Sequence, residues 1–306
     1  MNREPGISLT PVGPPWSLAN RLIMHPKINP IGIMQGRLSP PVGGRIQSFP
    51  VDSWRQEFSR AREAGLACIE WVYEVETEAG NPLATEAGVG EIKDLVRKTG
   101  VAVWSICADF YMKERLVGDD GAPRPQAVEH LHLLLRRASG LGARYIVLPF
   151  VDESSLTSAP ELEGLLNVLT SLMSRAQQAA VELHLETDLK PAPLAQLLAK
   201  MSHPLLRANY DIGNSASLGH DPVEELTLLG PWLGSVHIKD RLRGGGTVPL
   251  GTGAADFGAC FRGFLQSNYQ GPFILQAARV EGMSETELAI RNRRFVENQV
   301  AGVRAD

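Results

Sequence analysis

Short apolar segments and amphipathic segments alternate along this chain eight times. The apolar segments have the length and composition of strands and are bounded by glycine, proline or charged residues. They span residues 30–34, 67–72, 101–106, 145–149, 181–186, 206–211, 235–239 and 273–277. In the segments between them, apolar residues recur at helical spacing, as Trp54, Phe58 and Ala61 do before Gly65. Strict alternation of this kind predicts a parallel sheet with right-handed helical crossovers.

The number of strand–helix units decides between two forms of parallel sheet. Eight units can close a barrel, whereas they are many for an open doubly wound sheet, and no GxGxxG follows the first strand. The sequence therefore predicts a single (β/α)8 TIM barrel over residues 28–306, preceded by an irregular, proline-rich extension over residues 1–27. The extension has no apolar core long enough for a signal peptide, and no stretch approaches a membrane span. We expect a cytoplasmic protein that binds no membrane.

Composition limits the partners of this chain. With 306 residues, 43% of them hydrophobic, it can bury a large core. A net charge of −4 without a long basic run argues against a nucleic-acid partner. The three cysteines, Cys68, Cys107 and Cys260, are far apart and form no CxxC, which predicts buried thiols in a reducing compartment. A homo-oligomer is left open.

Polar residues stand near the ends of several predicted strands. In a parallel barrel the active site lies at the carboxyl ends of the strands. The residues found there are Glu70, Glu186, Asp211, His237 and Gln276. Each alone has an ordinary structural explanation, such as a salt bridge, a turn cap or a hydrogen-bonded core histidine. Together they suit a divalent ion such as Mn²⁺, Mg²⁺, Co²⁺ or Zn²⁺. We predict a metal site formed by Glu186, Asp211 and His237, with Gln276 near or on it.

The stretch from residue 235 to residue 257 carries further polar chemistry. Lys239 ends the seventh strand, and Asp240 and Arg241 follow at once. The glycine run at residues 244–246 could bring backbone N–H groups to an anion. A polar surface turn with a hairpin tip is the alternative.

Several of these segments resemble the sugar isomerase and epimerase superfamily of xylose-isomerase-like barrels, which includes ketose 3-epimerases, hydroxypyruvate isomerases, inosose dehydratases and endonuclease IV. The segments are Leu185-Glu186-Thr187, Tyr210-Asp211-Ile212-Gly213-Asn214, Val236-His237-Ile238-Lys239-Asp240 and Val248-Pro249-Leu250-Gly251-Thr252-Gly253. The resemblance runs from about residue 31 to the C-terminus. It implies that Glu186, Asp211 and His237 match three of the family's metal ligands. Where many members have a fourth ligand, a glutamate, this chain has Gln276.

The resemblance also implies a reaction. A divalent metal polarises the carbonyl of a keto-sugar or sugar phosphate while a carboxylate removes the neighbouring proton. Such a protein is a sugar isomerase or epimerase that works through an enediolate. The catalytic candidates are Glu186, Glu70 and Lys239. The substrate-binding candidates are His184, Asn214, Asp240, Arg241 and Arg279.

Gln276 leaves the reaction type open. An amide can bind a metal through its carbonyl, but it cannot exchange a proton near neutral pH. Either Glu186 acts alone in an aldose–ketose isomerisation, or a second residue serves the other face in an epimerisation. The candidates for that residue are Glu70, Asp240 and His184, in this order. A metal-dependent lyase resembling inosose dehydratase and a non-catalytic sugar-binding barrel are further alternatives. A nuclease would need a basic groove and more histidines at the site.

Overall fold

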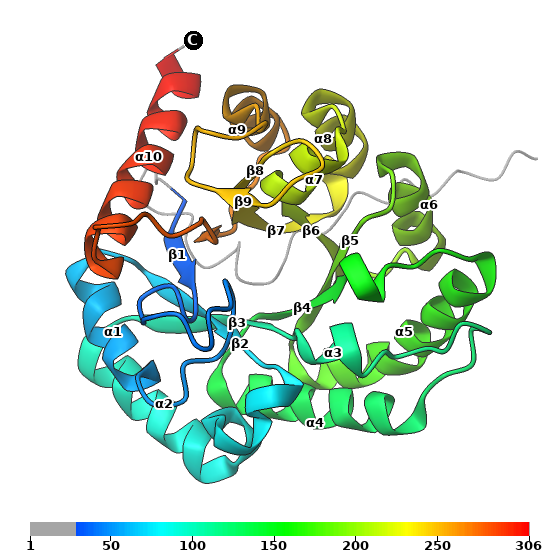
Figure 1. Ribbon diagram of the computed structural model, residues 1–306. Coiled ribbons are helices and arrows are strands. Elements are labelled where there is room, and N and C mark those ends of the chain that lie inside the picture. Colours follow the sequence, from blue (N-terminus) through cyan, green and yellow to red (C-terminus); the bar gives the residue numbers. More distant parts are fainter. Residues whose placement is uncertain (1–28, 306) are drawn as a thin grey trace, which may run out of the picture.

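Eight parallel strands close into a barrel surrounded by helices in the computed structural model, which describes residues 29–305 (Figure 1). The barrel strands are β1 (Ile31–Met34), β2 (Cys68–Val72), β3 (Ala102–Cys107), β4 (Tyr145–Phe150), β5 (Glu182–Thr187), β6 (Leu206–Asp211), β7 (Leu233–Ile238) and β10 (Phe273–Leu275). Their closed order is β1-β10-β7-β6-β5-β4-β3-β2, so each barrel strand pairs with its neighbours along the chain. The prediction of a (β/α)8 barrel is confirmed.

Helices form the connections between the strands. The α-helices are α1 (Trp54–Glu63), α2 (Glu86–Thr99), α3 (Phe110–Lys113), α4 (Pro125–Leu141), α5 (Ala159–Ala179), α6 (Pro191–Met201), α7 (Ile212–Leu218), α8 (Pro222–Leu229), α9 (Phe257–Gln266) and α10 (Glu285–Ala305). The described part of the chain also has the short 3-10 helices η2 (Val75–Gly80), η3 (Pro82–Ala84), η4 (Asp152–Ser154) and η5 (Gly230–Trp232). A separate antiparallel ribbon consists of β8 (Asp240–Arg241) and β9 (Thr247–Val248).

The ends of two helices show why the sequence pattern was informative. Gly100 and Gly142 follow α2 and α4 in the left-handed conformation, with φ of 76° and 83°. A residue without Cβ adopts this conformation without strain, and its N–H then bonds the last helical turn. The short helices α3 and α7, by contrast, were not predicted, and they begin just after β3 and β6.

The other predictions about the chain as a whole are confirmed in part and untested in part. The extension predicted over residues 1–27 lies outside the described residues. Within residues 29–305, no helix is both long and apolar enough to cross a membrane. Cys68, Cys107 and Cys260 are buried and unpaired, as predicted. The cytoplasmic location and the homo-oligomer stay predictions.

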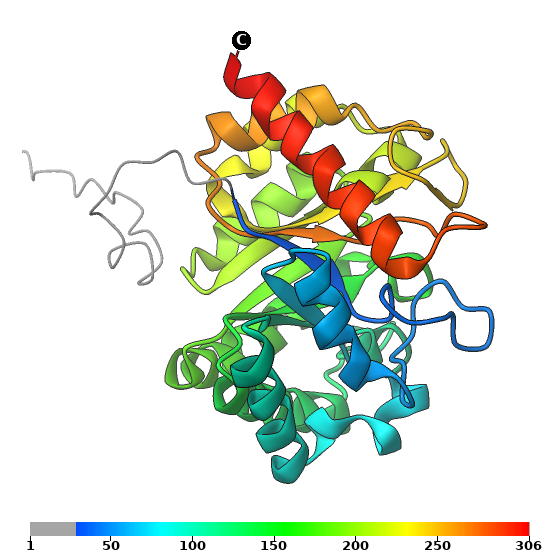
Figure 2. The same cartoon turned by 90° about the vertical axis from the view of Figure 1, so that its left-hand side faces the viewer.

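The two faces of β5 have different surroundings. In β5, Leu183 and Leu185 belong to the core, whereas His184 and Glu186 hydrogen-bond to polar side chains of β7 and β6. The long connections after β1 and β9 project from the same end of the barrel (Figure 2). This is the carboxyl end of the strands, where the sequence places the site.

The glycine run at residues 244–246 is the tip of the β8–β9 ribbon. The backbone N–H of Gly244 donates to the Ser217 carbonyl at 2.9 Å, and that of Gly245 donates to the Leu242 carbonyl at 2.9 Å. These two N–H groups are therefore engaged within the protein. The hairpin tip of the two alternatives is observed, and these two N–H groups are not free to bind an anion.

Candidate active site

Glu186, Asp211 and His237 meet near the carboxyl ends of β5, β6 and β7. One ligand atom of each lies within 4.8 Å of those of the others, and all three side chains are buried. His237 Nδ1 is 3.4 Å from Glu186 Oε2 and 3.7 Å from Asp211 Oδ2. Atoms bonded at about 2.0–2.2 Å to one ion lie roughly 3–4 Å apart, so these separations fit a single divalent ion. Of the residues that the structure describes, only these three form such a cluster.

A buried carboxylate orients His237. Glu70 Oε1 accepts a hydrogen bond from His237 Nε2 at 2.7 Å, and Ser105 Oγ donates to Glu70 Oε2 at 2.6 Å. Because Nε2 donates to Glu70, Nδ1 is the nitrogen that faces Glu186 and Asp211. Burial alone would lower the pKa of His237, but the charges of Glu70 and Glu186 outweigh it and raise the pKa well above its ordinary value. The surroundings of Nδ1 therefore favour a cation, either a proton or a metal ion.

Asp211 is held between the start of α7 and a lysine. Its Oδ1 accepts the backbone N–H of Asn214 at 2.8 Å, and Lys239 Nζ donates to its Oδ2 at 3.3 Å. Burial would raise the pKa of Asp211, but Lys239 and His237 outweigh it and lower the pKa to about 2. Asp211 is thus ionised at ordinary pH and does not carry protons.

Two amides fix the carboxylate of Glu186. Asn209 Nδ2 donates to Oε2 at 3.1 Å, and Asn214 Nδ2 donates to Oε1 at 2.8 Å. Arg241 Nη1 in turn donates to Asn214 Oδ1 at 2.9 Å, which sets the orientation of this amide. In residues 29–305, no lysine or arginine forms an ion pair with Glu186. Each Glu186 oxygen therefore keeps a lone pair for a metal ion or a proton.

A cavity of about 280 Å³ opens beside Glu186. The predicted site residues that line it are Glu186, Asn214, Lys239 and Gln276. The other polar residues in its wall are Arg37, Arg45, Gln47, Glu74, Glu76, Cys107, Asp109, Lys113, Asp152, Glu153 and Thr247. A cavity with such a polar wall is suited to binding a small hydrophilic molecule.

Gln276 presents a free carbonyl oxygen in this cavity wall. Its Nε2 donates to Gln47 Oε1 at 2.7 Å, and Gln47 Nε2 donates to Asp109 Oδ2 at 2.7 Å. Because the Asp109 carboxylate accepts, Gln47 turns its nitrogen to Asp109 and its carbonyl to Gln276. Gln276 Oε1 is buried and has no hydrogen-bond donor among the described residues. Gln276 lines the same cavity as Glu186, and an unpartnered amide oxygen there fits a metal ligand.

Glu70 and His184 lie beneath the cavity instead of in its wall. His184 Nδ1 is 2.8 Å from Ser235 Oγ, and its Nε2 is 2.9 Å from Glu182 Oε2. Its ring stacks on Tyr145 with centroids 4.2 Å apart. Both side chains face the barrel interior, as predicted, but both are fully buried there. Neither side chain lines the cavity, and their predicted roles beside a substrate stay predictions.

Asp240 and Arg279 hold loops around the cavity. Asp240 Oδ2 accepts the backbone N–H of Gly251 at 2.9 Å, within the connection that follows β9. Arg279 Nη2 donates to the carbonyl of Gly36 at 2.7 Å. Neither residue lines the cavity, and neither does Arg241. The structure thus places these three predicted substrate contacts where they support the walls.

Arg37, Gln47 and Asp109 line the cavity, although the sequence analysis did not single them out. Arg37 and Asp109 stand three and two residues beyond the last residues of β1 and β3. A search that included the two or three residues after each predicted strand would have identified Arg37 and Asp109. Gln47 lies in the long connection before α1, where no local pattern marks it.

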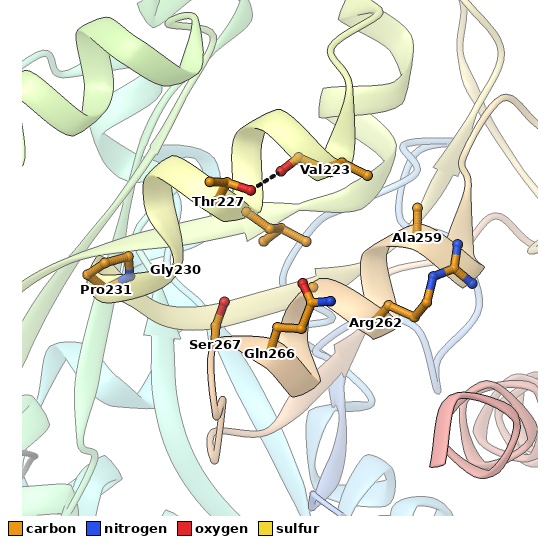
Figure 3. Close-up of a pocket in the computed structure, with 10 residues that line it drawn as sticks. Val223, Thr227, Gly230, Pro231, Ala259, Arg262, Gln266 and Ser267 are labelled. Carbon is orange, nitrogen blue, oxygen red and sulfur yellow. Dashed lines mark hydrogen bonds between the residues drawn. The ribbon is translucent and has the colours of Figure 1, made fainter. Parts of the chain in front are cut away.

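A larger cavity of about 450 Å³ lies between α8 and α9, on the outside of the barrel (Figure 3). Val223, Thr227, Pro231 and Arg262 are among the residues that line it. Thr227 Oγ1 donates to the Val223 carbonyl at 2.6 Å within α8. No carboxylate, histidine or cysteine stands in its wall, so it offers neither acid–base groups nor metal ligands.

The fold and the site together define a class of protein: a parallel barrel with a buried Glu–Asp–His cluster beside a polar cavity at the carboxyl ends of its strands. A sequence profile of the xylose isomerase-like TIM barrel family matches residues 58–299, and the chain belongs to this family. The resemblance seen in the sequence is confirmed.

Relatives within this family are sugar epimerases. L-ribulose-5-phosphate 3-epimerase UlaE of Shigella flexneri serotype 5b is 29% identical over 250 residues, which cover 77% of this chain and 86% of that protein. The structure of an L-ribulose 3-epimerase has a TM-score of 0.69 at 18% identity and covers 91% of this chain and 96% of its own. The IolI protein, solved with a bound zinc atom, has a TM-score of 0.69 at 14% identity, covering 90% and 99%. These structures confirm the fold, and the sequence relatives bear out the predicted isomerase class.

Proposed function

We propose that this protein is a metal-dependent isomerase or epimerase of a keto-sugar or a keto-sugar phosphate. One observation carries the proposal: Glu186, Asp211 and His237 cluster beside a polar cavity that is also lined by Gln276, whose carbonyl oxygen is unpartnered. Membership of the xylose isomerase-like family and the epimerase relatives support the same class.

Four side chains would hold the metal, each through one atom. These atoms are a carboxylate oxygen of Glu186, a carboxylate oxygen of Asp211, Nδ1 of His237 and Oε1 of Gln276. When bound there, Mn²⁺, Mg²⁺, Co²⁺ or Zn²⁺ would polarise the substrate carbonyl and stabilise the charge of an enediolate. Glu70 supports this arrangement from below, because its hydrogen bond keeps Nδ1 of His237 turned to the site.

Glu186 is the proposed proton carrier. It lines the cavity, its two amide donors fix its plane, and no basic side chain among the described residues neutralises it. It would take the proton from the carbon next to the carbonyl, and the C–H electron pair would then form the enediolate double bond. Returning that proton to the neighbouring carbon gives an isomerisation.

Arg37 is the proposed contact for an anionic group of the substrate. It lines the cavity, is only 7% exposed and has a buried Nε without a partner. Burial, and then the neighbouring charge of Arg279, lower the pKa of Arg37 to about 10, so an anion at this position would be stabilised. Arg45 also lines the cavity, but it is paired with Glu74 at 2.8 Å. Relatives named for L-ribulose 5-phosphate support a phosphate as this anion.

Deuterium exchange tests the proposal. The protein is incubated in D₂O with Mn²⁺ and L-ribulose 5-phosphate, L-ribulose, or other keto-sugars and their phosphates, and deuterium at the α-carbons is followed by NMR. We expect exchange with at least one compound, and we expect EDTA and Glu186→Gln to abolish it. Glu163→Gln, on the exposed face of α5, is the matched control and should keep it. No exchange with any compound, or exchange that survives Glu186→Gln, refutes the proposal.

A further inference from the structure

Inverting a carbon next to a carbonyl requires proton carriers on both faces of the planar enediolate. Glu186 serves one face, and the amide of Gln276 cannot serve the other. The three alternatives suggested by the sequence, Glu70, Asp240 and His184, do not line the cavity. A second carrier therefore has to be a different group in the cavity wall.

The carboxyl groups of the wall can be compared one by one. Besides Glu186 they are Glu74, Glu76, Asp109, Asp152 and Glu153. Glu74 is paired with Arg45 at 2.8 Å, and Glu76 is paired with Lys113. Asp152 and Glu153 are exposed to solvent. Asp109 is the one that is both sheltered and free of a basic partner within residues 29–305.

The contacts of Asp109 are neutral hydrogen bonds. Gln47 Nε2 donates to its Oδ2 at 2.7 Å, and the Cys107 thiol donates to its Oδ1 at 3.2 Å. Burial raises the pKa of Asp109, the two hydrogen bonds lower it, and burial prevails, so that the pKa is about 6. Both protonation states therefore exist near neutral pH. The charged groups that act on it are Glu186, Glu74 and Arg37.

Asp109 stands across the barrel mouth from His237 and two strands from the strand that carries Glu186. It follows β3, which is four strands from β7 in the closed order of eight, so it lies opposite the strand that carries His237. Both Asp109 and Glu186 reach the same cavity. A substrate held in this cavity between the two carboxyl groups would turn one face toward Glu186 and the other toward Asp109.

We propose that Asp109 is the second proton carrier, which makes the reaction an epimerisation. This inference rests on the proposed function. Glu186 removes the α-proton from one face, and the C–H electron pair enters the enediolate. Asp109 in its acid form donates its proton to the same carbon from the other face, and the enediolate electron pair forms the new C–H bond. Glu186 then loses a proton to solvent and Asp109 regains one, so the net change is inversion alone.

Asp109→Asn is the first test, because asparagine keeps the shape of the side chain without an exchangeable acid. With Mn²⁺ and the keto-sugar that exchanges in D₂O, we expect formation of the inverted product to fall by about 100-fold or more. Exchange into the recovered substrate, which needs only Glu186, should fall by less than about tenfold. Asp94→Asn, exposed on α2, is the matched control and should keep both rates. Retained inversion, or an equal loss of both rates, overturns the inference.

The wild-type protein supplies a second test that does not depend on the folding of a variant. In a single turnover in D₂O, the inverted product should carry deuterium, because Asp109 has equilibrated with solvent before the reaction. Inverted product that keeps the substrate's own proton overturns the inference. So does a wild-type protein that exchanges the α-proton without inverting, an outcome that leaves the proposed function intact. Absence of exchange refutes the proposed function itself, and the inference with it.

Discussion

His237 Nε2 and Glu70 Oε1 lie 2.7 Å apart, and both side chains are completely buried. The contact points to a positioning role for Glu70, which the sequence analysis had considered as a base. It leaves Nδ1 of His237 facing Glu186 and Asp211, at 3.4 Å and 3.7 Å from their nearer oxygens. Glu70 thus holds His237, and His237 faces the oxygens of Glu186 and Asp211. Metal binding should depend on this arrangement.

We predict that Glu70→Gln weakens Mn²⁺ binding by about 10- to 100-fold, because the amide no longer holds His237 with a charge-assisted hydrogen bond. Titration calorimetry measures the affinity. Glu182→Gln is the matched control, since Glu182 bonds His184 at 2.9 Å and should leave the affinity unchanged. At saturating Mn²⁺ the Glu70 variant should still exchange the substrate α-proton. Complete loss of exchange there would instead identify Glu70 as a proton carrier.

We predict that Arg241→Gln lowers kcat by roughly tenfold with little change in KM, because Arg241 acts on Asn214, which orients Glu186. The loss should be equal for a sugar and its phosphate. Steady-state kinetics with both substrates check this. A raised KM for the phosphate alone, with kcat unchanged, would mean that Arg241 binds the substrate directly, as the sequence analysis expected.

We predict that Arg37→Met reduces the preference for a phosphorylated over a neutral substrate by about 10- to 100-fold, corresponding to roughly 1.5–3 kcal/mol for a charge-assisted hydrogen bond. The ratio of the two kcat/KM values measures it. Arg279→Met is the comparison, since Arg279 bonds the Gly36 carbonyl and does not line the cavity. Its effect on the ratio should be smaller. An unchanged ratio in Arg37→Met excludes Arg37 as the anion contact.

Stability should depend on pH through Glu57, a buried residue of α1. Its carboxylate accepts the backbone N–H groups of Gly36 and Leu38, at 2.9 Å and 3.1 Å from Oε1. Burial, only partly offset by these hydrogen bonds, raises its pKa from 4.5 to about 7. The folded state therefore holds a proton that the unfolded state has lost between these two values. The stabilising contribution is complete below pH 4.5 and is lost as the pH rises through 7.

We accordingly expect Glu57→Gln to be more stable than the wild type by about 2 kcal/mol at pH 8, with little difference at pH 4.5. Urea unfolding at the two pH values provides the comparison. Equal stability at pH 8, or an advantage for the wild type that grows with pH, would show that the ionised form of Glu57 is the one favoured by folding.

The grouping of Glu186, Asp211 and His237 was predictable because barrel topology alone brings the strand ends together. Glu186, Asp211 and His237 need no loop to place them, and their spacing follows from the order of β5, β6 and β7. Alternation along a strand predicts which face of the sheet a side chain lies on, but not how deep in the barrel it lies. His184 and Glu186 share a face, yet two residues of strand separate them by roughly 6.6 Å, enough to place His184 inside the barrel.

The rest of the site depends on contacts between segments distant in the sequence. Gln47 enters the cavity because it bonds Gln276 and Asp109, more than 60 residues away in either case. Asp240 follows Lys239 just after a strand end, where a substrate contact would be expected. Its carboxylate instead accepts a hydrogen bond from the backbone N–H of Gly251. Residue type and position do not show which polar side chains are hydrogen-bonded by loop backbone groups. The residues of the cavity wall could therefore not be predicted from the sequence.

Anomalous diffraction from crystals soaked in Mn²⁺ would show whether the ion binds to Glu186, Asp211 and His237. We predict one peak, bonded at about 2.0–2.2 Å to Glu186, Asp211 and Nδ1 of His237, with Oε1 of Gln276 as the fourth protein ligand. A peak elsewhere, coordination through Nε2 of His237, or no peak at saturating Mn²⁺ would contradict it.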